Sequence, residues 1–318
     1  MTIKFTNFVG CMRKTLLTLA TIVVVCHAAF AQGGESMPFM RIDRNPATMG
    51  MAMAGSISGG SAAWSAYRNS AVLPFYEGTM DISLGYQLWA PKAVKTNNIN
   101  FGGAYRISDK FGLSMGAVYQ RGEEYTVYTD AGVADGTYNP SEILFALGGG
   151  YQVAEKVSVG VNARFASQSL AEDKTYSAFG ADVNVLYNGG PYRVSVGVCN
   201  IGSSVTSDEG DSFSIPASVN LAGVYDAHFG EKSVLEAALD CDYYFESGFT
   251  AAVGAQYGYN DMVFVRAGYH YGAEDAIFPS FACIGLGGKF SGVRIDVAYL
   301  LANQDLKNTL TLGLAYSF

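Results

Sequence analysis

The sequence predicts an all-β fold: a transmembrane antiparallel β-barrel of about 14 strands with an N-terminal plug in its lumen. Three observations favour this class. The chain contains 38 Gly among 318 residues and only 15% charged residues, which is unlike an average soluble domain. Apolar and polar residues alternate along most of the chain. This alternation follows an N-terminal leader that is typical of exported proteins.

Residues 1–31 have the pattern of a signal peptide. A basic pair at 13–14 precedes an apolar stretch at 16–25, and residues 29–31 read Ala-Phe-Ala, a motif typical of a cleavage site. Translation starting at Met12 would give a more typical leader than the full sequence, and both starts stay open. We therefore expect the chain to be exported and its leader to be removed.

The composition narrows the range of partners. A formal net charge of −8 argues against nucleic acid, because binding to phosphates draws on Lys and Arg. After the leader, Cys199, Cys241 and Cys283 show no spacing typical of a metal or redox site. We therefore expect no cofactor, no metal and no nucleic-acid partner.

Residues 32–78 do not alternate, and we expect them to form a plug, or hatch, inside the barrel. The segment is rich in Met, Ala and Gly. A barrel of 14 strands is too wide for its own side chains to fill, so an inserted segment is mechanically reasonable. A flexible periplasmic tail is the alternative. The residues expected to build the plug, or to gate a ligand, are Phe39, Arg41, Met49, Met51, Met53 and Asn69.

Residues 79–318 form the predicted barrel. In its first segment Met80 and Ile82 share one face while Asp81 and Ser83 take the other, a period of two that indicates a strand. The last segment repeats this pattern. The alternating segments are 79–88, 97–107, 111–121, 142–153, 156–168, 175–187, 191–201, 215–228, 233–245, 249–259, 262–272, 281–290, 293–301 and 309–318.

The two faces of these segments differ in charge. One face is nearly free of charge, as a lipid-facing band must be, where charge costs about 2 to 4 kcal/mol at mid-depth. In lipid every backbone N–H and C=O needs an internal partner, so strands span a membrane only as a closed barrel. We therefore predict an outer-membrane location in contact with lipid, with a secreted soluble β-sandwich as the alternative. Polar residues expected in the lumen include Arg164, Asp182, Asp240, Asp242, Arg266 and His270.

The connections between segments differ in length. Short polar turns at 108–110, 188–190 and 291–292 contrast with long connections at 122–141 and 202–214. Outer-membrane barrels have short periplasmic turns and longer extracellular loops. We therefore expect the two long connections on the outer surface, where they would recognise a partner.

Three short motifs lie in the plug segment: Phe39-Met40-Arg41-Ile42, then 45–50, which reads Asn-Pro-Ala-Thr-Met-Gly, and 66–71, which reads Ala-Tyr-Arg-Asn-Ser-Ala. They resemble the mature N-terminus of the PorV/PorQ family of Bacteroidetes, whose pattern runs F-L-x-I, a small-residue turn, M-G-G-A and Y-x-N-P-A. Two departures stand out. Residues 51–54 stand where the family prefers glycines, and Ser70 replaces the Pro of the N-P-A motif.

The resemblance implies a 14-stranded, FadL-like outer-membrane barrel beside the type IX secretion system. Family members receive exported cargo and deliver it to a surface attachment complex. We therefore interpret the chain as a non-enzymatic secretion or surface-assembly component whose partners are secretion-system proteins or exported cargo.

Two further hypotheses stay open. FadL relatives pass hydrophobic compounds through the lumen and out by a lateral opening, so a transporter that binds a hydrophobic ligand is the main alternative. An enzyme that uses His270 is the other. It gains little from the sequence, because His228 and His270 are the only histidines after the leader.

Overall fold

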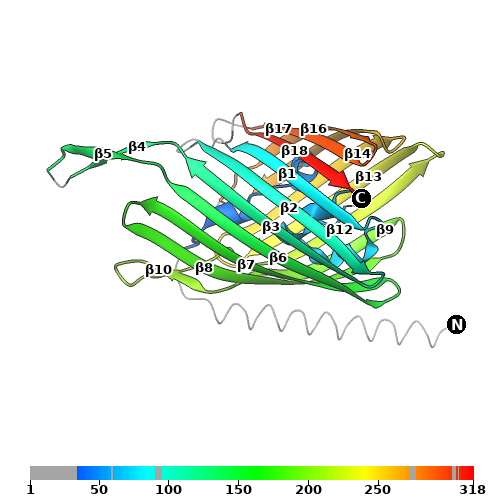
Figure 1. Ribbon diagram of the computed structural model, residues 1–318, viewed down its shortest axis with the longest axis horizontal. Coiled ribbons are helices and arrows are strands. Elements are labelled where there is room, and N and C mark those ends of the chain that lie inside the picture. The colour runs from blue at the N-terminus through cyan, green and yellow to red at the C-terminus, as the bar shows by residue number, and fades with distance from the viewer. Residues whose placement is uncertain are drawn as a thin grey trace.

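Fourteen strands form a closed antiparallel barrel in the computed structural model (Figure 1). The structure describes residues 34–58, 60–89, 95–129, 131–272, 277–302, 306 and 308–318. The predicted signal peptide lies outside these residues. The fold class predicted from the alternation is confirmed. In the part of the chain that the structure describes, no helix is long and apolar enough to cross a membrane.

The barrel strands coincide with the alternating segments to within about three residues at each end. They are β1 (Met80–Trp89), β2 (Thr96–Ser108), β3 (Phe111–Gly122), β6 (Ser141–Ala154), β7 (Val157–Ala171), β8 (Lys174–Asn188), β9 (Tyr192–Gly202), β12 (Ser218–Phe229), β13 (Ser233–Tyr244), β14 (Gly248–Tyr259), β15 (Val263–Gly272), β16 (Phe281–Phe290), β17 (Val293–Leu301) and β18 (Leu310–Ser317). Two separate hairpins, β4 (Tyr125–Tyr128) with β5 (Ala134–Tyr138) and β10 (Ser204–Thr206) with β11 (Ser212–Ser214), belong to the connections.

The ring closes between its first and last strands. β1 pairs with β18 from Asp81 opposite Ser317 to Leu88 opposite Leu310, and it pairs with β2 on its other edge. Every strand of the ring has a hydrogen-bonded neighbour on both sides. The backbone groups of the wall therefore find their partners without water, as a sheet in lipid requires.

The two faces of the wall differ in chemistry. Leu84, Leu147 and Leu286 point outward and are 54%, 64% and 62% exposed. Asn162 and Asp182 point inward and are completely buried. A closed 14-stranded ring with an apolar outer belt is the architecture of an outer-membrane barrel. The chain is therefore an outer-membrane protein.

The two ends of the barrel carry different connections. The two longest connections carry the hairpins β4–β5 and β10–β11, and β4–β5 stands beyond the ring (Figure 1). Because periplasmic turns are the short ones, this end of the barrel is the outer end. Not every outer connection is long, because 172–173 and 245–247 join their strands by only two and three residues. In the first case β7 and β8 are each 15 residues long and extend outward themselves. The periplasmic turns are 109–110, 155–156, 189–191, 230–232, 260–262 and 291–292.

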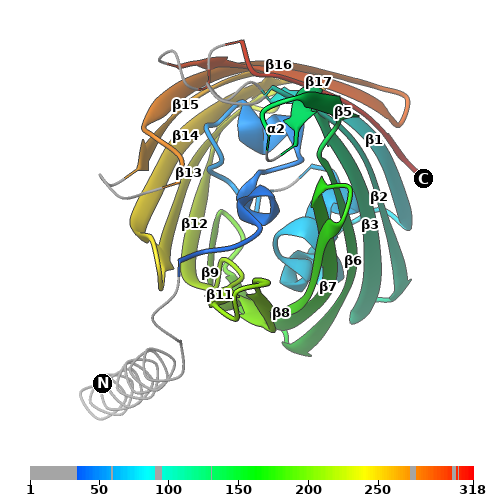
Figure 2. The same cartoon turned by 90° about the vertical axis from the view of Figure 1, so that its left-hand side faces the viewer.

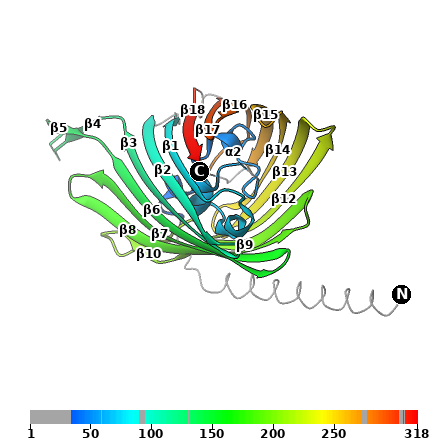
Figure 3. The same ribbon diagram turned by 45° about the vertical axis from the view of Figure 1, so that its right-hand side comes forward.

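Residues 34–58 and 60–78, called the hatch from here on, lie inside the ring (Figure 2, Figure 3). The hatch begins at the outer end, where the Ser36 N–H donates to the Ser214 carbonyl at 2.8 Å. It reaches β1 at the periplasmic end, where the Arg106 N–H donates to the Thr79 carbonyl at 2.8 Å. Its short helical elements are η1 (Pro38–Arg41), α2 (Pro46–Met49), η2 (Ala62–Tyr67) and η3 (Ser70–Phe75).

Two asparagines start helical turns of the hatch in the same way. The side chain of Asn45 accepts the Ala47 N–H at 3.0 Å before α2, and the side chain of Asn69 accepts the Ala71 N–H at 3.0 Å before η3. Asn is among the preferred residues at this capping position. At η3 the residue after the cap is Ser70, whose hydroxyl lies 3.0 Å from the Ser114 hydroxyl of the wall. Ser70 therefore follows the cap and adds a contact between the hatch and β3.

Glycines of the wall make room for the hatch. A Cβ added to Gly285 would lie 2.8 Å from the Cα of Gly50, and one added to Gly254 would lie 2.5 Å from the Cβ of Met51. Gly313 faces the ring of Pro46 in the same way. Such contacts are too close for any side chain, so part of the high glycine content allows two backbones to approach.

Candidate functional site

An apolar vestibule lies at the outer mouth of the barrel. Its volume is about 390 Å³, within the range of about 300–1,000 Å³ that is typical of small-molecule sites. Strand ends, outer connections and the first turn of the hatch form its walls. The lining residues are Pro38, Phe39, Ile42, Trp89, Thr96, Gln120, Gly122, Pro140, Glu142, Gln168, Leu170, Ile277, Phe278, Pro279 and Leu306.

The first helical turn of the hatch closes the inner side of the vestibule. Pro38 begins η1, a position where its fixed φ suits a helix and its missing N–H costs nothing. The Met40 N–H donates to the Met37 carbonyl at 3.1 Å, and the Ile42 N–H donates to the Phe39 carbonyl at 3.2 Å. This compact turn presents the buried side chains of Phe39 and Ile42 to the cavity.

Two aromatic rings from distant parts of the sequence form one wall. The ring centroids of Trp89 and Phe278 lie 5.2 Å apart with an interplanar angle of 56°. Both side chains are buried. Tilted ring pairs at this spacing are favourable and leave flat apolar surface for a ligand.

Glu142 of β6 supplies the charge in this lining. Its carboxylate accepts the amide N–H groups of Gln120 and Gln168, the latter at 2.6 Å. Arg44 lies behind this group, where its Nη2 donates to the Phe39 carbonyl at 2.9 Å and its Nη1 to Gln120 at 3.4 Å. Burial lowers the pKa of Arg44 to about 10, so it stays a cation at neutral pH.

A polar latch, formed by Glu35, Arg41, Tyr244 and Ser247, fastens the start of the hatch to the rim. Arg41 Nη1 donates to Glu35 Oε1 at 3.2 Å and to Ser247 Oγ at 2.8 Å. The Arg41 guanidinium carbon lies 3.4 Å from the centroid of the Tyr244 ring, a cation–π contact. Burial raises the pKa of Glu35, although the nearby Arg41 opposes this shift.

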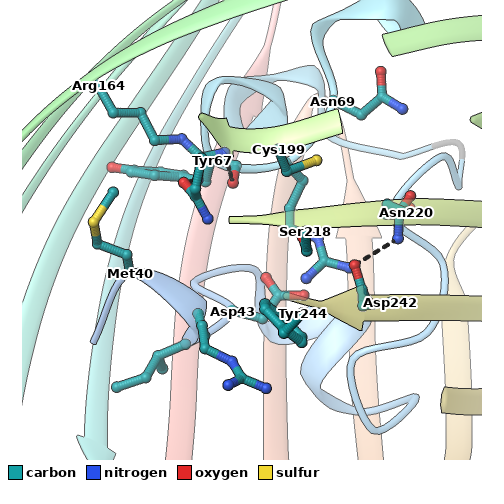
Figure 4. Close-up of a pocket in the computed structure, with 15 residues that line it drawn as sticks. Met40, Asp43, Tyr67, Asn69, Arg164, Cys199, Ser218, Asn220, Asp242 and Tyr244 are labelled. Atoms are coloured by element: carbon teal, nitrogen blue, oxygen red, sulfur yellow. Dashed lines mark hydrogen bonds between the residues drawn. The ribbon is translucent and has the colours of Figure 1, made fainter. Parts of the chain in front are cut away.

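Beyond the latch, polar side chains line a small cavity in the lumen (Figure 4). This cavity has a volume of about 40 Å³, room for about one water molecule. Arg164 forms an ion pair with Asp182, and Arg164 Nη1 donates to Asn200 Oδ1 at 2.7 Å. Asn220 Nδ2 donates to Asp242 Oδ1 at 2.9 Å. An apolar ligand in the vestibule therefore faces a closed polar layer.

The remaining polar candidates connect the hatch to the wall or one strand to another. Asp240 Oδ2 accepts the Gly55 N–H at 2.7 Å and thereby holds the hatch against β13. Arg266 Nη1 forms an ion pair with Asp296 Oδ1 at 2.7 Å, between β15 and β17. These are structural contacts inside the lumen.

His270 does not form a catalytic arrangement with the lumen carboxylates. Its ring stacks on Phe281 with centroids 4.8 Å apart, and neither ring nitrogen has a partner among the described residues. Asp240 and Asp242 bind the hatch and Asn220 instead. Within the described ranges no group of His, Cys, Asp and Glu side chains could hold a metal ion.

The hatch residues chosen from the sequence lie at different depths. Phe39 lines the vestibule and Arg41 belongs to the latch beside it. Met49, Met51 and Met53 are buried further along the hatch, away from the vestibule lining. Asn69 caps η3 and its Nδ2 donates to Ser195 Oγ at 2.9 Å.

Sequence reasoning missed most of the vestibule. Trp89, Glu142 and Phe278 lie in or beside segments that were interpreted only as strands and loops. One signal was available: the run Ile277-Phe278-Pro279 places two large apolar residues in a connection, where solvated loops usually carry polar ones. Glu142 gives no such signal, because it fits the alternation as an ordinary polar residue.

A second, larger cavity opens at the periplasmic end, with a volume of about 580 Å³. Arg193 and Lys289 line it and are paired with acids, Arg193 with Asp226 at 2.8 Å and Lys289 with Asp261 at 2.6 Å. The lumen therefore has an apolar cavity at the outer end, a cavity with polar and apolar lining residues at the periplasmic end, and the hatch between them.

No protein-family model matches the chain, and a comparison with curated proteins finds no match. Solved structures do share the fold. The Pseudomonas putida toluene transporter TodX is 14% identical, with a TM-score of 0.60 over 86% of this chain and 97% of that chain. The Ralstonia pickettii toluene transporter TbuX is 13% identical, with a TM-score of 0.57 over 86% and 97%. A Pseudomonas aeruginosa FadL homologue is 14% identical, with a TM-score of 0.52 over 90% and 97%. The chain therefore has a FadL-like barrel fold.

Proposed function

We propose that this protein transports hydrophobic small molecules across the outer membrane and binds them first in the vestibule. The observation that carries this proposal is the apolar cavity of about 390 Å³ at the outer mouth, closed on its inner side by the hatch. A ligand arriving from outside reaches this cavity before it meets the polar layer of the lumen. The fold shared with barrels described as toluene transporters supports the same function.

The structure suggests a sequence of events for transport. An apolar molecule enters because burying its surface is favourable by about 25 cal/mol per Å². It rests against Phe39, Trp89 and Phe278, which line the cavity. Passage then requires residues 35–42 to move, because the cavity of about 40 Å³ behind them is too small for a ligand. The hatch would act as a gate that opens at its outer end, where the latch holds it.

Binding of a neutral aromatic probe to the purified protein in nanodiscs tests this function. Replacing Phe278→Ala removes one ring of the vestibule wall and is expected to weaken binding by about tenfold, the equivalent of about 1.4 kcal/mol. Phe290→Ala is the matched control, since Phe290 lies at the periplasmic end of β16 and is 74% exposed. If the wild-type protein shows no saturable binding, or if both variants lose affinity equally, the proposed site is wrong.

The role in type IX secretion implied by the PorV/PorQ resemblance stays a second candidate. One feature favours it: β4–β5 stands beyond the barrel and exposes Tyr128 and Val133, an aromatic and an aliphatic side chain that a protein partner would cover. Deleting residues 124–138 should then abolish co-purification of exported proteins in mild detergent while leaving ligand binding intact. Co-purification that is absent from the wild type, or unchanged by the deletion, would remove this candidate.

A further inference from the structure

We infer that the vestibule accepts uncharged hydrophobic molecules and discriminates against carboxylates such as fatty-acid anions. This inference rests on the proposed function and specifies its substrate class. It follows from the charge in the vestibule lining, the hydrogen bonds that surround this charge, and the charges around the outer mouth.

The first step concerns Glu142. This carboxylate lines the vestibule and is held by the amides of Gln120 and Gln168. Both amides donate to it and so favour the ionised form of the side chain, whereas its burial favours the protonated form. At alkaline pH, where the side chain is ionised, a ligand carboxylate that entered the cavity would come within several ångströms of this negative charge.

The second step concerns the cations. None of the described residues that line the cavity is Lys or Arg. Arg44 is buried behind the floor and donates to the Phe39 carbonyl and to glutamine side chains. Arg41 is buried and engaged in the latch by Glu35. Lys95 precedes the lining residue Thr96 but is exposed and is not part of the lining.

Among the described residues that line the cavity, no side chain is therefore a cation that could neutralise a bound fatty acid. Its carboxylate would either sit beside Glu142 or stay in water and pull part of the chain out of the cavity. Like charges separated by several ångströms near a protein surface repel strongly enough to weaken binding by at least about tenfold. An alcohol or a hydrocarbon of the same size avoids this penalty.

The third step concerns the rim. On the described outer connections, exposed acidic residues outnumber basic residues. The basic residues there are Lys95, Arg121 and Lys174, and Lys174 forms an ion pair with Asp208. Such a field repels anions before they reach the cavity and is screened by salt. These acids are Glu123, Glu124, Asp135, Glu172, Asp173, Asp208, Glu209, Asp211 and Glu246.

A matched pair of ligands tests the inference directly. The sequence contains two Trp residues, so Trp64→Phe leaves the vestibule residue Trp89 as the sole tryptophan. Quenching of Trp89 fluorescence by bromine-tagged dodecanol and by bromine-tagged dodecanoate is measured in nanodiscs of phosphatidylcholine at about pH 9, where the carboxylates are ionised. Dodecanol is expected to quench saturably, and dodecanoate to bind at least about tenfold more weakly.

The variant Glu142→Gln identifies the cause. It should raise the affinity for dodecanoate by about tenfold and change that for dodecanol by less than about twofold. Glu246→Gln removes an exposed acid of the same outer end and should change neither affinity by more than about twofold. If Glu142→Gln does not fold, the comparison of the two ligands in the Trp64→Phe protein still tests whether the vestibule discriminates against carboxylates.

Two outcomes count against the proposals and can be told apart. Dodecanoate binding as tightly as dodecanol, or more tightly, overturns the charge discrimination and leaves the transport function standing. The absence of saturable quenching by either ligand overturns the transport function itself.

Discussion

Two residues of the hatch adopt a backbone conformation that side chains resist. Ala52 has φ 57° and Met53 has φ 74°, both in the left-handed region just after α2. For residues other than glycine this conformation costs roughly 1–2 kcal/mol each. The Met53 N–H donates to the Thr48 carbonyl at 2.9 Å, which helps to hold the turn. The chain therefore accepts strain in this turn of the hatch.

Glu35 makes the docking of the hatch dependent on pH. Burial raises its pKa above the usual 4.5, so the carboxyl binds its proton more tightly when the latch is closed than when it is open. The stabilisation of the docked hatch by protonated Glu35 is complete below about pH 4.5, and it is lost as the pH rises through the raised pKa. We expect hydrogen exchange at residues 35–42, corrected for its intrinsic pH dependence, to be slower at about pH 4 than at about pH 8.

The variant Glu35→Gln should remove this pH dependence, because its amide does not titrate. Glu172→Gln is the control, since Glu172 is exposed on another outer connection and is not among the charges that act on Glu35. Protection that instead increases toward alkaline pH would show that attraction to Arg41 outweighs burial, the opposite sign to the one argued here.

At the scale of elements, the hatch is fixed by glycines that leave space on the wall. Gly254 of β14 and Gly268 of β15 both face Met51, and Gly285 of β16 faces Gly50. These glycines form a strip of the wall without side chains, called the glycine track, against which the backbone of residues 50–51 packs. The hatch therefore docks by close backbone packing as well as by the polar contacts of Asp240.

Replacing Gly268→Ala should undock this part of the hatch while the barrel still forms. The added Cβ would lie 2.8 Å from the Met51 Cα and closer still to its carbonyl, and overpacking of this kind costs about 1–3 kcal/mol. Hydrogen exchange at residues 46–54 should speed up. Gly223→Ala is the control, because a Cβ there meets nothing within 4 Å. Equal protection in the two variants would mean that the glycine track does not position the hatch.

The strands could be predicted from the sequence because their signal is local. Residues two apart share a face, so each of the 14 segments reports its own orientation. The path of the hatch has no such signal, because it depends on contacts such as that between Asn69 and Ser195, which are 126 positions apart. The vestibule is hidden for the same reason: Trp89 and Phe278 meet only after the ring closes. Among the residues that line the vestibule, the sequence predicted a role for Phe39. It also predicted a role for Arg41, which belongs to the latch next to the vestibule.

On the scale of the whole molecule, the barrel keeps opposite chemistries on the two sides of one wall. The lumen side holds buried ion pairs such as Arg164 with Asp182, while the outer side is a belt of exposed aliphatic and aromatic residues. A charge is therefore tolerated or costly according to the face and the depth of its position. This dependence is a quantitative test of the membrane location.

Leu147 is the position where a charge on the belt should cost most. It lies at the middle of β6 and is 64% exposed on the outer face. Leu147→Arg should lower the free energy of unfolding in lipid vesicles by about 2–4 kcal/mol, as expected for Arg near the bilayer midplane. Phe290→Arg, at the last residue of β16 beside the periplasmic turn, should cost only about 0–1 kcal/mol because it lies near the interface. Reversible unfolding in urea measures both variants. Equal costs at the two depths would mean that the belt does not face hydrocarbon, and the vestibule would then not open at a membrane surface.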